Sequence, residues 1–81
     1  MSNLIDNTIE AEVDARGLLC PLPVLRARKL LKLMEAGQVL RVWATDRASI
    51  IDMPHFCAQA GHVYLGCEEQ DGALLHRLQR G

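Results

Sequence analysis

The alternation of two hydrophobic periods along the 81-residue chain is the feature that most limits how it can fold. Residues 10–15 (Glu-Ala-Glu-Val-Asp-Ala) alternate apolar with charged side chains, which is typical of a strand with one wet face. From Pro23 onward the apolar residues recur instead at helical spacing, at Ala27, Leu30, Leu31 and Met34. A chain of this length has room for only one hydrophobic core, so these segments must share it.

The rest of the chain continues this alternation of strands and helices. The pattern predicts a strand at 38–45, a helix at 48–60, and strands at 62–69 and 73–79. Asp46 is the expected N-cap of the second helix, and Pro54 is expected to kink that helix or to split off its first turn. Asp71-Gly72 is a two-residue hairpin signal between the last two strands.

The order β-α-β-α-β-β predicts an α+β fold, a two-layer α/β sandwich. Two helices should pack on one face of a four-stranded mixed sheet. We expect residues 1–9 to form a flexible tail, residues 10–81 to form a single domain, and the free protein to be a monomer.

Composition and cysteine usage favour a cytoplasmic protein. The longest uncharged apolar run, residues 17–25, contains two prolines and is far shorter than the roughly 20 residues that span a bilayer. Residues 1–13 contain no basic residue and no long apolar stretch, so no signal peptide and no membrane association are expected. The three cysteines, Cys20, Cys57 and Cys67, lack Cys-x-x-Cys spacing and suit a reducing compartment.

Positive charge gathers in one part of the chain. The net charge is −1, yet residues 15–34 hold five bases and no acid. Arg26 and Lys29 within this stretch are candidates for docking an acidic protein partner. We do not expect direct nucleic-acid binding, because the net charge is negative and the three aromatic residues lie inside predicted elements.

Cys20 is the candidate nucleophile. It stands three residues before Pro23, at the mouth of the first helix, where the helix dipole and nearby bases are expected to lower the pKa of its thiol. Pro21 and Pro23 fix the backbone at their positions and should hold the sulfur on a stiff, exposed turn. Leu18, Leu19 and Leu22 flank this turn, and not all three can face the core. Leu19 and Leu22 are therefore candidates for a docking surface.

Residues 17–24, Gly-Leu-Leu-Cys-Pro-Leu-Pro-Val, resemble the Cys-Pro-x-Pro signature of the TusA (SirA-like) sulfur-carrier family. The likeness continues over residues 13–81, at Asp14, Gly17, Lys29, Gly37, Asp46-x-Ala48-Ser49, Asp52-x-Pro54-x-Phe56-Cys57 and Gly61-His62. Arg47 departs from the pattern, because many members have proline after the aspartate, and this departure bears on partner preference.

The resemblance implies the β-α-β-α-β-β sandwich, with Gly17, Pro21 and Pro23 shaping the motif turn. It implies a sulfurtransferase in which Cys20 accepts sulfane sulfur from a cysteine desulfurase or rhodanese, carries it as a persulfide and passes it to an acceptor protein. Such transfer needs neither metal nor cofactor. The receiving pathway stays open between tRNA thiolation, molybdenum cofactor biosynthesis and sulfur metabolism.

Two alternatives remain. His55, Cys57, His62 and Cys67 could form a zinc set, but structural zinc motifs use tightly spaced pairs, and Cys57 and Cys67 are better explained as structural residues. The protein could also be a non-catalytic regulatory or adaptor module in which Cys20 is a redox sensor.

Overall fold

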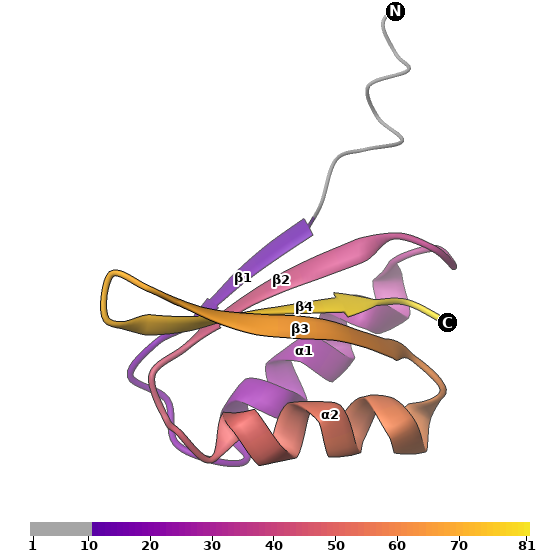
Figure 1. Ribbon diagram of the computed structural model, residues 1–81. Helices are drawn as coiled ribbons and strands as arrows, with labels where there is room; N and C mark the ends of the chain where they lie inside the picture. Colours follow the sequence, from indigo (N-terminus) through magenta and orange to yellow (C-terminus); the bar gives the residue numbers. More distant parts are fainter. Residues whose placement is uncertain (1–10) are drawn as a thin grey trace, which may run out of the picture.

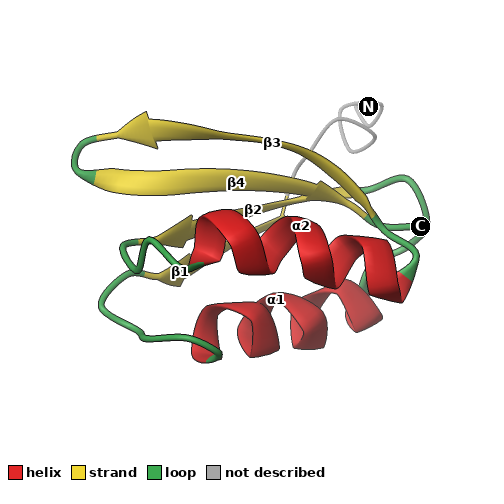
Figure 2. Ribbon diagram, turned by 60° about the horizontal axis from the view of Figure 1, so that its bottom comes forward, coloured by secondary structure: helices red, strands yellow, loops and turns green. Residues whose placement is uncertain are grey.

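The computed structural model describes residues 11–81 and has the predicted order of elements (Figure 1). They are β1 (Ala11–Ala15), α1 (Leu22–Leu33), β2 (Val39–Ala44), α2 (Ser49–Ala60), β3 (Val63–Gln70) and β4 (Ala73–Gln79). The two helices lie side by side against one face of the sheet, as Figure 2 shows. The expected tail at residues 1–9 and the first residue of the expected first strand, Glu10, lie outside the described residues.

The four strands form one mixed sheet in the order β1-β2-β4-β3. β1 pairs with β2 in parallel, whereas β4 is antiparallel to both of its neighbours. Parallel pairing aligns Ala15 with Ala44, so β1 and β2 end at the same edge of the sheet. The loops that lead into α1 and α2 therefore begin next to each other.

The core lies between the sheet and the helices. It is made of small and aliphatic side chains from both layers: Ala15, Ala27, Leu31, Leu40, Val42, Met53, Cys57 and Leu78. Cys57 is buried here, as expected for a structural cysteine, and burial raises the pKa of its thiol to about 11.

The second helix differs from the prediction in two ways. α2 is continuous across Pro54, so its first turn is not split off, and Met53 and Cys57 near this proline are packed in the core. Asp46 is not the N-cap residue, a position that Ala48 takes. The Asp46 carboxylate instead accepts hydrogen bonds from the backbone N–H groups of Ala48 and Cys20, at 3.0 and 2.7 Å.

The prediction that Cys67 is structural is also wrong, since its side chain is exposed. β3 is an edge strand whose pairing with β4 shifts between Tyr64 and Gly66. Cys67 therefore lies on a strand with only one neighbour and is not enclosed by the core. Within residues 11–81, no helix has the length and apolar character that crossing a membrane requires.

Truncating one core leucine tests this packing. Leu40 is 0% exposed, and Leu40→Ala should lower the free energy of unfolding by about 2–5 kcal/mol, because it leaves a cavity. Leu33 is 78% exposed on α1, and Leu33→Ala should change the free energy of unfolding by no more than about 0.5 kcal/mol. Urea unfolding followed by circular dichroism measures both, and equal losses would contradict this description of the core.

Candidate functional site

Cys20 lies on the turn between β1 and α1, and its side chain is exposed, as predicted. The neighbouring loop, between β2 and α2, holds this turn through two side-chain oxygens that accept hydrogen bonds from backbone N–H groups of the turn. Gly17 N–H donates to Thr45 Oγ1 at 2.8 Å, and Cys20 N–H donates to Asp46 Oδ2 at 2.7 Å. Gly17 has a φ of 81°, a conformation that favours glycine over other residues. The adjacent ends of two parallel strands thus fix the backbone at the sulfur.

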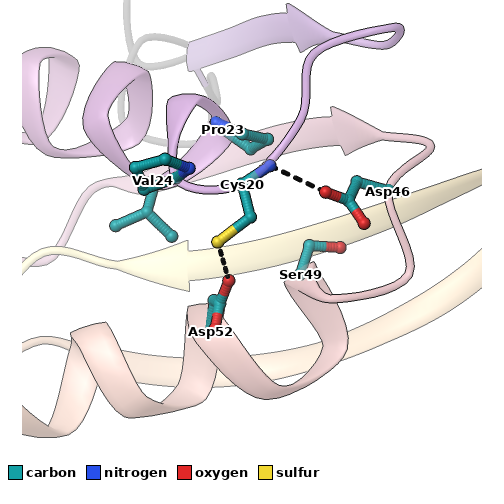
Figure 3. A pocket seen from close by; sticks show the side chains of 7 residues that line it. Cys20, Pro23, Val24, Asp46, Ser49 and Asp52 are labelled. Atoms are coloured by element: carbon teal, nitrogen blue, oxygen red, sulfur yellow. Dashed lines mark hydrogen bonds between the residues drawn. The ribbon is translucent and has the colours of Figure 1, made fainter.

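Asp52 of α2 is the side-chain partner of Cys20. The thiol donates a hydrogen bond from Sγ to Asp52 Oδ2 over 2.8 Å, and Figure 3 shows the sulfur directed at this carboxylate. This hydrogen bond, together with partial desolvation and the negative charges of Asp52 and Asp46, raises the pKa of the Cys20 thiol. The prediction of a lowered pKa is therefore wrong.

The expected cations do not reach the sulfur. Arg16 forms a two-pronged ion pair with Asp14, at 2.8 and 2.9 Å. Arg26 and Lys29 line a separate groove with Val13 and Leu30, on the β1 side of α1. The charges that act on the thiol are those of the carboxylates Asp52 and Asp46, which explains the direction of the pKa shift.

The contact of Asp46 with the Cys20 turn favours the charged form of its carboxylate. Its carboxylate accepts the N–H groups of Cys20 and Ala48, and these bonds lower the pKa of Asp46. Asp46 therefore anchors the backbone of the turn, whereas Asp52 faces the reactive atom.

A pocket surrounds the sulfur, and a groove leads away from it. The pocket is lined by Cys20, Pro21, Pro23, Val24, Asp46, Ser49 and Asp52 (Figure 3). The groove shares Cys20, Pro21, Val24 and Asp52 with the pocket and continues along the two helices to His55, Phe56 and Gln59. An extended group from another molecule could approach the sulfur along this groove.

The leucines around the turn divide as expected. Leu18 packs against the core, whereas Leu19 is 70% and Leu22 47% exposed. Leu22 begins α1, one residue earlier than predicted, with Pro23 at the second helical position.

The residues of the possible zinc set are not brought together. Cys57 is buried in the core, Cys67 is exposed on β3, and His62 Nδ1 accepts a hydrogen bond from Gly81 N–H at 3.0 Å. Across residues 11–81, no cluster of three or more histidine, cysteine, aspartate or glutamate side chains is arranged to hold a metal ion.

Asp52 is the site residue that sequence reasoning missed. It lies 32 positions after Cys20, and no local pattern links the two. Its place in the Asp-x-Pro-x-Phe-Cys stretch shared with the TusA pattern was the available signal.

Comparison with known proteins assigns the family. Residues 11–80 match the family model described as Sulfurtransferase TusA. The sulfur carrier protein TusA of Allochromatium vinosum is 48% identical over 71 residues, which cover 88% of this chain and 93% of the relative. The Bacillus subtilis protein YrkF is 41% identical over 69 residues, 85% of this chain, but the match spans only 37% of YrkF.

A solved structure shares the fold. The crystal structure of a SirA-like protein from Desulfitobacterium hafniense superposes with a TM-score of 0.71 at 32% identity, covering 88% of this chain and 97% of that one. The family match over residues 11–80 and the fold of this neighbour agree with each other. The chain belongs to the TusA family.

Proposed function

We propose that the protein carries sulfur as a persulfide on Cys20, taking it from a cysteine desulfurase or rhodanese and passing it to an acceptor protein. The observation that supports this most is the exposed Cys20 thiol at the end of a groove, with the Asp52 carboxylate 2.8 Å from its sulfur. The name of the Allochromatium vinosum relative, a sulfur carrier protein, supports the same role.

Loading is a thiol–persulfide exchange. Cys20 loses its proton to Asp52, and its sulfur attacks the terminal sulfur of the donor's persulfide. A sulfur–sulfur bond forms to Cys20, the donor's own sulfur–sulfur bond breaks, and the donor leaves as a thiolate that takes up a proton. One sulfur atom has moved, and the reaction consumes no external oxidant or reductant.

Discharge runs the same exchange with the acceptor. The acceptor's thiolate attacks the terminal sulfur of the Cys20 persulfide, and the Cys20 thiolate leaves and regains a proton from Asp52. Asp52 thus acts as base in loading and as acid in discharge.

The partner-docking surface proposed for this transfer lies on α1. Leu22, Arg26 and Lys29 are spaced i, i+4 and i+7, so they share one side of the helix, and Leu19 precedes them at the turn. Exposed leucines beside the two bases Arg26 and Lys29 suit a partner with an acidic rim around an apolar centre.

The proposed setting is the cytoplasm, where the free thiols of Cys20, Cys57 and Cys67 would stay reduced. A role of Cys20 as a redox sensor is less well supported, since sensor cysteines have a low pKa, whereas the pKa of Cys20 is raised. The acceptor pathway would be tRNA thiolation, molybdenum cofactor biosynthesis or sulfur metabolism.

Replacing each cysteine in turn tests where sulfur is held. Cys20→Ser should fold normally and lose all transfer of labelled sulfur from a cysteine desulfurase and cysteine. Cys57→Ser and Cys67→Ala should keep most of it, because Cys57 is buried and Cys67 lies on β3. Complete loss in folded Cys57→Ser would show instead that transfer uses two thiols.

Asp52→Asn should speed alkylation of Cys20 by iodoacetamide near neutral pH. Removing the carboxylate takes away both the acceptor that holds the thiol proton and the charge that repels the thiolate, so the pKa of Cys20 should fall. Each unit by which the pKa of Cys20 falls should raise the alkylation rate about threefold. The fraction of thiolate increases more than the nucleophilicity of that thiolate decreases.

Peptide mass spectrometry against pH follows Cys20 alone in this experiment. Glu35→Gln removes the same charge beyond the other end of α1 and should leave the pKa of Cys20 unchanged. An unchanged pKa in Asp52→Asn would exclude Asp52 as the group that holds the thiol proton.

Reversing charge on α1 tests docking. Arg26→Glu with Lys29→Glu should slow sulfur transfer at sub-saturating partner several-fold, and added salt should bring the wild-type rate toward that of the variant. Arg28→Glu with Lys32→Glu is the control, because it makes the same change in net charge outside the groove that Arg26 and Lys29 line. If a shifted alkylation pKa of Cys20 accounts for the whole defect, Arg26 and Lys29 tune the nucleophile and do not dock the partner.

A further inference from the structure

A buried polar chain connects α2 with the sheet directly behind the Cys20 pocket. Ser49 is 2% and His76 0% exposed, the two buried polar residues of the described chain. Ser49 Oγ lies 2.9 Å from His76 Nε2, and Tyr64 Oη lies 2.9 Å from His76 Nδ1. The chain thus joins the first residue of α2 to the central strand β4 and the edge strand β3.

Burying these hydrogen-bonded polar side chains in a core costs free energy. His76 lies in β4 between Leu75 and Arg77, and Leu74 and Leu78 lie two residues away on either side. An apolar side chain at this position would need no hydrogen bonds. Burial lowers the pKa of His76, so the imidazole is neutral and uses one nitrogen as donor and the other as acceptor. Both nitrogens have partners, so the imidazole is held in one orientation.

Ser49 is the link between this chain and Cys20. It lines the same pocket as Cys20 and Asp52, and its backbone N–H donates to the Asp46 carbonyl at 3.0 Å. Asp52 follows Ser49 by three positions, so the two side chains stand on the same side of α2 in adjacent turns. The segment that Ser49 anchors therefore includes both carboxylates that contact Cys20.

We propose that Ser49 and His76 are positioning residues for Cys20: their buried hydrogen bond fixes the start of α2 so that Asp52 meets the sulfur. This inference rests on the proposed function for its purpose, because a carboxylate that gives and takes one proton must stay within hydrogen-bond distance of the sulfur. Tyr64 supports the chain from β3 by holding the other nitrogen of His76.

Ser49→Ala tests the proposal without any sulfur donor. Losing the anchor should loosen the contact between Asp52 and Cys20, so the alkylation pKa of Cys20 should fall toward that of Asp52→Asn, and alkylation near neutral pH should speed up about two- to threefold. In the Asp52→Asn background, Ser49→Ala should have no further effect on this pKa. His76→Leu, which fills a similar volume without nitrogen atoms, should give the same two results.

Leu40→Ala separates positioning from general destabilisation, since it weakens the core without touching this chain and should leave the pKa of Cys20 unchanged. An unchanged pKa in folded Ser49→Ala would overturn the proposal, as would an equal shift with and without Asp52. Failure of Cys20 to accept sulfur would overturn the proposed function and leave these alkylation results standing.

Discussion

The parallel pairing of β1 with β2 is the constraint on which the site depends. It aligns Ala15 with Ala44, so the loops before α1 and α2 start side by side although about 30 residues of sequence separate them. The second loop then supplies Thr45 and Asp46 as acceptors for the backbone of the first. Without this pairing, Cys20 would have no fixed position relative to Asp52, and the turn would lack the acceptors that hold it.

In the mechanism that we propose, the site holds a proton, which differs from the common arrangement in which a cationic helix mouth makes a cysteine permanently reactive. Asp52 keeps the resting thiol protonated, and Arg16 is occupied by Asp14. A protonated thiol resists adventitious oxidation, and a carboxylate in contact with it is available as a base when a donor arrives. For a carrier that waits between two partners, such a resting state combines low side reactivity with a path for the proton. In the same proposal, the choice of partner depends on the exposed surface around the turn.

The fold could be predicted from sequence because its signals are local. The spacing of apolar residues indicates strands and helices, and Gly, Pro and Asp residues mark the turns and helix ends between them. The motif around Cys20 was recognisable for the same reason. The charge environment was not, because it depends on side chains that meet only after folding: Asp52 from α2 reaches the sulfur, whereas Arg26 and Lys29, close in sequence, line another groove. Continuity of α2 at Pro54 and exposure of Cys67 were missed because they depend on tertiary packing and strand order.

The mass of the loaded protein tests the central claim most directly. After incubation with a cysteine desulfurase and cysteine, the wild-type chain should gain about 32 Da, the mass of one sulfur atom, and reductant should remove it. Peptide mapping under non-reducing conditions should place the added sulfur on the peptide that contains Cys20. An unchanged mass with both an active cysteine desulfurase and an active rhodanese as donor would contradict the account. So would an added sulfur mapped to Cys57 or Cys67.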